Sequence, residues 1–174
     1  MLIVAGSGHS IALYAAAIAR ALGASRVDFV DTDRRRLELA QALGANSIEG
    51  PPPERVGQYP ITVDASAEAA GLACALRSVA PGGVCTSIGI YYADPTPSIP
   101  LLDMYGRGVR FHTGRANASA DMPAVLALVQ AGRLHPEGVT SETVPWNDAA
   151  EALAEPSMKP VFVREPASIA SQGR

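Results

Sequence analysis

The chain has 174 residues, which is enough for one domain with a sizeable hydrophobic core. Charged residues make up 18%, apolar residues 48% and aromatic residues 5%, a composition typical of a sheet covered by helices. The formal charge of −3 gives no broad attraction to nucleic acid or to anionic lipid, so neither is expected as a partner. No apolar run reaches membrane-spanning length and the N-terminus lacks the features of a signal peptide, so we expect a cytoplasmic protein.

The chain opens with an apolar strand, a glycine-rich turn and a helix. Residues 2–5 form the short apolar run, and residues 11–22 carry apolar side chains at helical spacing. In a doubly wound α/β domain, a turn in this position offers backbone N–H groups and the positive end of a helix dipole to a pyrophosphate. Glycine also serves in tight turns without any ligand, so the motif alone leaves both interpretations open. The turn consists of Gly6, Ser7, Gly8, His9 and Ser10.

The first half of the chain then alternates strands with helices. Asp33 is placed to cap the second helix, and Ser66 is placed to cap the third. Short connections of this kind make the strands parallel and the crossovers right-handed. The expected elements are a strand at 26–30, a helix at 34–43, a short strand at 47–48, a strand at 61–64, a helix at 67–79, a turn at 81–83 and a strand at 84–90.

The second half continues this pattern and then changes. Pro123 is expected in the first turn of its helix, where proline is tolerated. The final residues, 167–174, are small and polar and are expected to be disordered. The alternation predicts an α/β, three-layer Rossmann fold with a doubly wound parallel sheet. The expected elements are a short helix at 101–105, a strand at 109–113, a helix at 121–131, strands at 139–144 and 160–163, and a helix at 147–154.

Asp31 follows the second strand, twenty-five residues after Gly6. A dinucleotide-binding domain needs an acceptor for the adenine ribose hydroxyls at this position, although an aspartate here can also simply begin a turn. Three arginines, 34–36, occupy the first turn of the next helix, where the dipole disfavours positive charge. They either contact a nucleotide or form a solvated face. Because Asp31 would repel a 2′-phosphate, NAD is preferred over NADP.

Two further segments end strands at the same edge of the predicted sheet. Residues Ile88, Gly89 and Ile90 are positioned to line a nicotinamide pocket, although Gly89 is equally consistent with close packing. Ala65 lies between Asp64 and Ser66, at the end of the strand before the third helix, where the polar residues also suit a helix cap.

The remaining reactive residues do not form a catalytic set. His9, His112 and His135 are scattered over a turn, a strand and a loop, without metal-ligand spacing. Cys74 and Cys85 fall in a predicted helix and a predicted buried strand, which indicates packed thiols. The sequence therefore predicts no catalytic residue and no metal ligand.

The motifs taken together resemble the cofactor-binding half of the medium-chain, zinc-type alcohol dehydrogenase family. The resemblance extends over residues 1–166, and the order of the motifs is its most specific feature. The matching runs are Gly6-Ser7-Gly8, Ala19-Arg20-Ala21-Leu22-Gly23-Ala24, Val30-Asp31, Arg36-Leu37-Glu38-Leu39-Ala40, Leu43-Gly44-Ala45, Val63-Asp64-Ala65-Ser66, Pro81-Gly82-Gly83, Ile88-Gly89, Ala131-Gly132-Arg133-Leu134, Val144-Pro145-Trp146, Ala149-Ala150-Glu151-Ala152-Leu153 and Lys159-Pro160-Val161.

This resemblance implies an NAD(P)-binding domain at 1–136 and a closing family segment at 137–166. In the family, the catalytic zinc and most of the substrate pocket belong to an N-terminal GroES-like domain, for which this chain has no counterpart. We therefore expect a dehydrogenase cofactor domain that does not transfer hydride to an alcohol by itself, and that forms a homodimer through the sheet edge. The predicted cofactor site comprises Gly6, Ser7, Gly8, His9, Ser10, Ile11, Asp31, Arg36, Ala65, Ile88, Gly89 and Ile90.

Three residues depart from the family pattern. His9 replaces a proline, Ser10 replaces an apolar residue that faces the nicotinamide, and Ile11 replaces the third glycine. The branched Ile11 side chain is expected either to hold the helix off the strand or to intrude on the pyrophosphate site. Two alternatives stay open: a non-catalytic nucleotide-sensing or interaction module, which the altered turn suggests, and a small methyltransferase. Methyltransferases also use a glycine turn and an acidic end of the second strand, but the helical and C-terminal motifs disfavour this alternative.

Overall fold

The computed structural model describes residues 1–7, 10–154 and 157–164. The chain divides into two compact units, Met1–Gly138 and Val139–Arg174. The expected tail at 167–174 lies outside the described residues. Each unit is described separately below.

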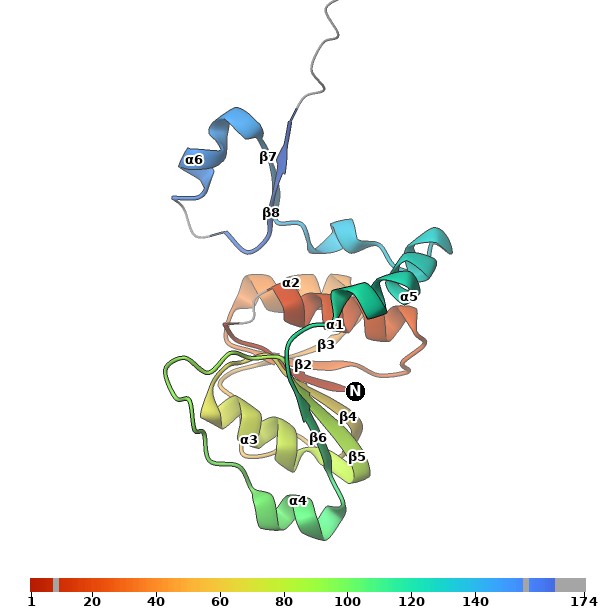
Figure 1. Ribbon diagram of the computed structural model, residues 1–174, viewed down its shortest axis with the longest axis vertical. Helices are drawn as coiled ribbons and strands as arrows, with labels where there is room; N and C mark the ends of the chain where they lie inside the picture. The colour runs from red at the N-terminus through yellow and green to blue at the C-terminus, as the bar shows by residue number, and fades with distance from the viewer. Residues whose placement is uncertain (8–9, 155–156, 165–174) are drawn as a thin grey trace, which may run out of the picture. The chain divides into compact units, whose positions relative to one another are not determined.

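The first unit is built on a six-stranded sheet in which every paired strand is parallel (Figure 1). The strand order is β3-β2-β1-β4-β5-β6, so successive strands run outward from β1 in one direction and from β4 in the other. This order confirms the predicted α/β Rossmann fold with a doubly wound parallel sheet. The strands are β1 (Leu2–Val4), β2 (Asp28–Asp31), β3 (Asn46–Glu49), β4 (Tyr59–Asp64), β5 (Val79–Ser87) and β6 (Arg110–Thr113).

Helices cover both faces of this sheet (Figure 1). The helices α1 and α2 lie on one face, and α3 and α4 lie on the other. The segment that includes α5 packs against α1, because Val125 and Leu128 contact the cluster formed by Ala17, Ala21 and Leu134. The helices are α1 (Ser10–Ala21), α2 (Arg34–Ala42), α3 (Ala69–Arg77), α4 (Leu101–Arg107) and α5 (Ala118–Gln130), followed by the 3-10 helix η1 (Pro136–Val139).

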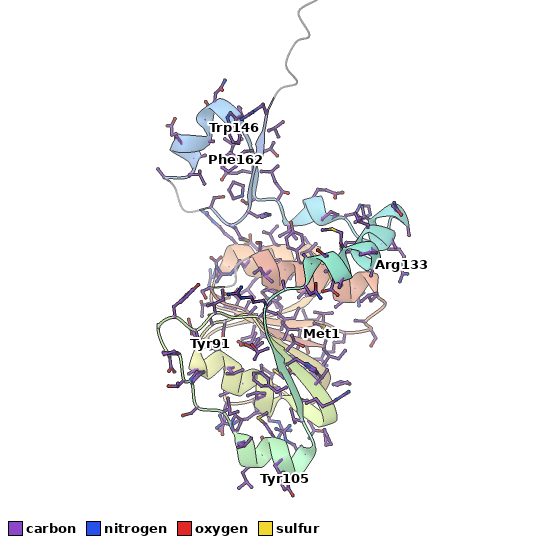
Figure 2. The ribbon with its side chains drawn as sticks, viewed as in Figure 1. Met1, Tyr91, Tyr105, Arg133, Trp146 and Phe162 are labelled. Carbon is purple, nitrogen blue, oxygen red and sulfur yellow. The ribbon has the colours of Figure 1, made fainter. Side chains whose placement is uncertain are left out.

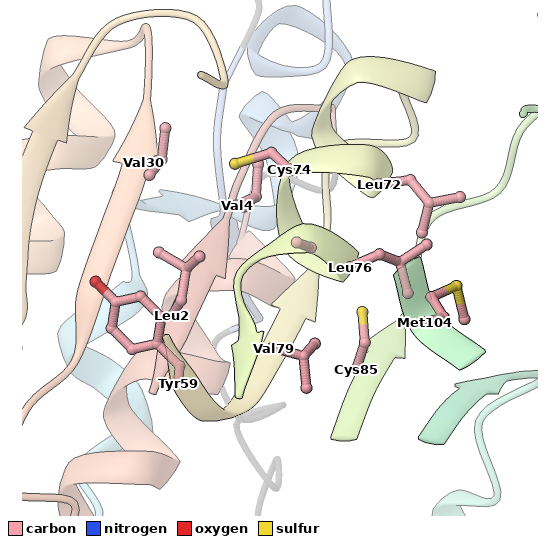
Figure 3. Close-up of a cluster of buried hydrophobic side chains, with 11 residues drawn as sticks. Leu2, Val4, Val30, Tyr59, Leu72, Cys74, Leu76, Val79, Cys85 and Met104 are labelled. Atoms are coloured by element: carbon pink, nitrogen blue, oxygen red, sulfur yellow. The ribbon is translucent and has the colours of Figure 1, made fainter. Parts of the chain in front are cut away.

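The core between the sheet and α3 is drawn in Figure 3. It is built mainly from aliphatic side chains such as Leu2 and Leu76, both fully buried. Cys74 and Cys85 are free thiols within the same cluster, as the sequence predicted. Burial raises the pKa of both thiols, that of Cys85 to about 11, so both are unreactive packing groups at neutral pH.

Several predicted boundaries were wrong around the third helix. Glu68, not Ser66, occupies the N-cap position of α3, because Ser66 accepts a hydrogen bond from Glu68 N in a turn just before the helix. Strand β5 begins at Val79, not at residue 84, because Tyr59 already pairs with Val79. A register shift between Tyr59 and Ile61 accommodates the turn predicted at 81–83, in which Gly82 has φ +71°.

Other boundaries differ in the later part of the chain. Strand β5 ends at Ser87, so residues 88–90 form a loop and not the end of a strand. Pro123 lies inside α5 and not in its first turn, since backbone bonds to the carbonyl of Asn117 extend the helix to Ala118. The strand predicted from residue 139 begins at Glu142, because Val139 belongs to η1.

The second unit contains a parallel pair of strands, β7 (Glu142–Pro145) and β8 (Pro160–Val163). The connection between them holds a 3-10 helix, η2 (Trp146–Asp148), and one turn of helix, α6 (Ala149–Ala152), in place of the single helix predicted at 147–154. The Arg164 guanidinium lies over the Trp146 ring, 4.3 Å from its centroid. This cation–π contact joins the end of β8 to the residue that follows β7.

Candidate functional site

Four parallel strands of the first unit end side by side. The register pairs Val4 with Val30 on one side and with Asp64 on the other, and Asp64 in turn pairs with Ser87. The chain therefore leaves β1, β2, β4 and β5 at the same edge of the sheet. Ligands of open parallel sheets bind outside this carboxyl edge, at the point where the strand order reverses, which here lies between β1 and β4.

Gly6 is required at this edge because the chain after β4 passes very close to it. A Cβ at Gly6 would lie 2.9 Å from Ser66 Cα and 3.0 Å from Ser66 O. The next residue, Ser7, donates from its N–H (3.3 Å) and from its Oγ (2.9 Å) to the same Ser66 carbonyl. Gly6 has no positive φ, so close approach and not a left-handed turn explains the glycine. Gly8 and His9 lie outside the described residues.

Helix α1 begins at Ser10, directly after the turn. Ile11 is 53% exposed, whereas the two residues after it, Ala12 and Leu13, are fully buried. The Ile11 side chain is therefore not wedged between the helix and the strand. The expectation that it holds α1 off the sheet is wrong, because the buried face of the helix begins one residue later with the small side chain of Ala12.

Asp31 ends β2 and is almost completely buried. Its carboxylate accepts two hydrogen bonds from Arg36, Nε to Oδ2 at 2.6 Å and Nη2 to Oδ1 at 2.7 Å, and a third from Asp33 N to Oδ1 at 2.9 Å. The hydrogen bonds from Arg36 to Asp31 raise the pKa of Arg36, and the fork geometry is that of a strong ion pair. A carboxylate offers about four acceptor positions, so one position on Oδ2 is left for a further donor.

The other two arginines of this run lie at the surface. Arg34 donates from Nε to Glu49 Oε1 at 2.8 Å, and both side chains are more than half exposed. Arg35 is exposed, and its backbone N–H donates to Asp33 Oδ1, which caps α2 as the sequence predicted. The unfavourable interaction of Arg34 and Arg35 with the dipole of α2 is therefore small, because both side chains are exposed. The positive charge of Arg36 is balanced by its ion pair with Asp31.

Asp64 is the most extensively hydrogen-bonded side chain of the edge. It is fully buried, and its Oδ1 accepts from Ser66 N (3.1 Å) and Ser66 Oγ (2.6 Å). Its Oδ2 accepts from Ser87 Oγ (2.7 Å) and from the phenol of Tyr91. Burial and the hydrogen bond to Asp64 raise the pKa of Tyr91 well above its usual value. The position of Tyr91 is labelled in Figure 2.

The loop after β5 also lies very close to the loop after β4. A Cβ at Gly89 would be 2.9 Å from both N and Cα of Ala67, so this glycine is required for close approach. Ala67 itself has φ +57°, a left-handed conformation that is unusual for alanine. Ala65 is fully buried, whereas Ile88 is half-buried and Ile90 is 63% exposed at the surface of this edge.

Sequence reasoning missed three residues of this edge: Ser87, Tyr91 and Gly71. A Cβ at Gly71 would lie 2.1 Å from Ser66 Oγ, so the glycine lets α3 pack directly on Ser66. Ser87 had a detectable signal, because a polar residue at the end of an apolar strand falls on the carboxyl edge. Tyr91 had none, because its contact with Asp64 spans 27 residues of sequence.

The histidines outside the turn take no part in this edge. His112 is exposed on β6, and His135 is an exposed partner of Glu137, 3.2 Å from Nδ1 to Oε1. Within residues 1–7, 10–154 and 157–164, no three His, Cys, Asp or Glu side chains are grouped so that they could hold a metal ion. No helix in the described part of the chain is long and apolar enough to cross a membrane.

The class of protein follows from a direct comparison with known families. Residues 10–131 match the zinc-binding dehydrogenase family, and the chain belongs to this family. The match begins at the first residue of α1 and continues past α5. The resemblance read from the sequence motifs is thereby confirmed, and the methyltransferase alternative is disfavoured.

Among the individual proteins that this chain resembles are several alcohol dehydrogenases. The chain is 31% identical over 138 residues to the "Probable zinc-binding alcohol dehydrogenase Rv1895" of Mycobacterium tuberculosis, covering 76% of this chain and 36% of that protein. Among solved structures, it resembles alcohol dehydrogenase TADH from Thermus sp. ATN1, with a TM-score of 0.76, 29% identity, and coverage of 94% of this chain and 51% of that chain. It shares the fold of the rspB alcohol dehydrogenase from Escherichia coli CFT073, solved with NADH, with a TM-score of 0.74, 19% identity, and coverage of 93% and 51%. This chain spans about half the length of such relatives or less.

Proposed function

We propose that this chain binds a nicotinamide dinucleotide across the carboxyl edge of its sheet, as the cofactor-binding part of an alcohol dehydrogenase-like oxidoreductase. The observation that carries the proposal is the meeting of β1, β4 and β5 at the reversal of strand order. There Gly6 crosses Ser66 within van der Waals distance, and Asp31 ends the neighbouring strand. In this arrangement a pyrophosphate would lie beside the start of α1, and Asp31 would accept from a ribose hydroxyl.

The residues present fit such a cofactor. The turn from Gly6 to Ser10, with the N-terminus of α1, would hold the pyrophosphate through backbone N–H groups. The free acceptor position on Asp31 Oδ2 would take one hydroxyl of the adenine ribose. Ala65 and the loop of Ile88, Gly89 and Ile90 would line the nicotinamide end. The bound cofactor would supply the hydride chemistry.

We further propose that NAD binds more tightly than NADP. A 2′-phosphate would meet the buried Asp31 carboxylate, and the two negative groups would repel each other. Arg36 does not remove this preference, because its guanidinium is already paired in fork geometry with Asp31. The exposed side chains of Arg34 and Arg35 are the groups that would favour NADP if the proposal were wrong.

Calorimetric titration with NAD and NADP at fixed salt tests this proposal. We expect NAD to bind at least about tenfold more tightly, and Asp31→Asn to reduce that ratio, because the amide no longer repels a phosphate. Asp121→Asn, an exposed change on α5, is the matched control and should leave the ratio unchanged. Tighter binding of NADP would assign the preference to Arg34 and Arg35. AMP binding as tightly as NAD would favour a nucleotide-sensing module, and no binding would refute both.

The 174-residue chain is proposed to lack alcohol turnover by itself, because the resemblance places the zinc and the substrate pocket in another domain of the family. Mixing the purified chain with NAD and a panel of primary and secondary alcohols should give no increase in NADH absorbance at 340 nm. A zinc-supplemented reaction is the control. Sustained NADH production would overturn this part of the proposal.

We also propose a homodimer joined at the edge of the sheet. β6 is the last strand in the order, so one of its edges has no neighbour among the described strands, and its residues are mostly exposed. Light scattering after gel filtration should give the mass of two chains. His112→Pro, a proline in the middle of this edge strand, should shift the mass toward one chain while circular dichroism shows the fold unchanged. A monomeric wild-type chain would refute the dimer.

A further inference from the structure

The loop that follows β5 is tied to the end of β4 and to the loop after β4 at three points. At its beginning, Ile88 N–H donates to the backbone carbonyl of Asp64 at 2.9 Å. Gly89 then packs against the backbone of Ala67 without room for a Cβ. Finally the phenol of Tyr91 donates to the Asp64 carboxylate, and its oxygen lies 3.5 Å from Ser87 Oγ. The chain between Ile88 and Tyr91 is therefore held at both ends.

The residue between these ties is the exposed one. Ile90 is 63% exposed, although its neighbour Gly89 packs against Ala67 and its neighbour Tyr91 bonds to Asp64. Tyr92, one residue after the last tie, is 87% exposed. Tyr91 thus marks the point beyond which the loop is no longer fixed by contacts to Asp64.

Asp64, which accepts the hydrogen bond from Tyr91, is a buried carboxylate without a basic partner among its hydrogen-bond donors. Asp64 is fully buried, and the donors that reach it are two serine hydroxyls, one backbone N–H and one phenol, all of them neutral. A buried carboxylate with neutral donors depends on each of these hydrogen bonds, and bonds to a charged acceptor are stronger than neutral ones. The Tyr91 bond therefore contributes more to holding the loop than a bond between two neutral groups would.

We propose that Tyr91 is a positioning residue for the nicotinamide half of the dinucleotide. Its hydrogen bond to Asp64 holds Ile88, Gly89 and Ile90 in one conformation, so that their backbone and the apolar Ile90 side chain form a prepared surface for a flat aromatic ring. Without this bond the loop must be ordered when the ligand binds, which lowers affinity. This inference rests on the proposed function of the same edge.

The experiment compares NAD with ADP-ribose, which lacks the nicotinamide ring, in calorimetric titrations of wild type and Tyr91→Phe. We expect Tyr91→Phe to weaken NAD binding about five- to tenfold and to change ADP-ribose binding less than about twofold. Asp64 keeps three of its four donors in this variant, so the fold should persist. Tyr92→Phe makes the same chemical change at an exposed neighbour and should alter neither affinity.

Hydrogen exchange gives a second readout that does not depend on the ligand. Backbone amides of residues 88–92 should exchange faster in Tyr91→Phe, with no change in the strands of the sheet. Equal weakening of NAD and ADP-ribose would indicate a general structural role and overturn the inference, as would unchanged affinities or unchanged exchange. If wild type binds neither ligand, the proposed function fails and this inference fails with it; if wild type binds both, only the inference is at stake.

Discussion

Two buried aspartates stand at opposite ends of this sheet, and they are used differently. Asp28 begins β2 and accepts hydrogen bonds from Arg26 Nε (3.0 Å), Asn46 Nδ2 (2.9 Å) and Tyr59 OH (2.6 Å). Asp64 ends β4 and accepts its hydrogen bonds from a serine in the following loop, from the end of β5 and from the loop beyond it.

The partners of each carboxylate indicate its role. Asn46 and Tyr59 are the first residues of β3 and β4, so Asp28 links strands that are already paired with their neighbours. Burial raises the pKa of Asp28, but the hydrogen bonds from Arg26, Tyr59 and Asn46 outweigh it, so the pKa falls below its usual value. Asp64 instead joins the loops that follow β4 and β5 to the ends of these strands. At the amino edge, where the strands begin, the network joins strand to strand; at the carboxyl edge it joins strands to the loops that follow them.

The largest expected effect comes from removing each carboxylate in turn. Asp64→Ala should lower the free energy of unfolding by about 3–4 kcal/mol, because it leaves buried donors without an acceptor. Asp28→Ala should cost less, about 2–3 kcal/mol, since the Arg26 side chain is 67% exposed and can turn to water. Urea denaturation measures both values. A larger loss of unfolding free energy for Asp28→Ala than for Asp64→Ala would show that the amino-edge network depends more strongly on its carboxylate.

A smaller effect is expected from alkaline pH at the amino edge. Burial and the hydrogen bond to Asp28 raise the pKa of Tyr59 to about 12, whereas an unfolded tyrosine titrates near 10. The contribution of Tyr59 is therefore fully present below pH about 10 and is lost as pH rises toward about 12, by on the order of 1–2 kcal/mol.

The measurement is the free energy of unfolding between pH 9 and 12 for wild type and Tyr59→Phe. The difference between the two free energies separates the titration of Tyr59 from the titrations of Cys85 and Tyr91, whose pKa values are also raised. Parallel pH curves for the two proteins would contradict the prediction.

The smallest effect concerns the strained residue at the carboxyl edge. Ala67→Gly should raise the free energy of unfolding by about 0.5–1 kcal/mol, because glycine adopts φ +57° without a Cβ penalty and loses only part of that gain to backbone entropy. Thermal melting measures the change. Ala80→Gly, a half-buried position on β5 without positive φ, is the control and should destabilise. Destabilisation by Ala67→Gly as well would show that the Ala67 methyl group makes contacts that outweigh its strain.

Local patterns in the sequence were sufficient for most of the elements. The apolar run of β1, the spacing of α1 and the Asp33 cap of α2 depend on neighbours within a few residues, and the structure confirms them. The boundaries that failed involve distant contacts. β5 starts early because Val79 pairs with Tyr59, and Ser66 lies two residues before the N-cap of α3, where its hydroxyl donates to Asp64 and accepts from Glu68 N–H.

The sequence by itself determined the class of this protein: alternating strands and helices, a glycine turn after the first strand, an acid after the second, and the ordered motifs of a dehydrogenase cofactor domain. Periodicity and turn chemistry are local properties, so they can be read without a structure. The tertiary structure alone decided what each polar side chain contacts. Asp31 is paired with Arg36 and Asp64 binds Tyr91, because burial leaves a carboxylate no water and every donor must come from the folded chain.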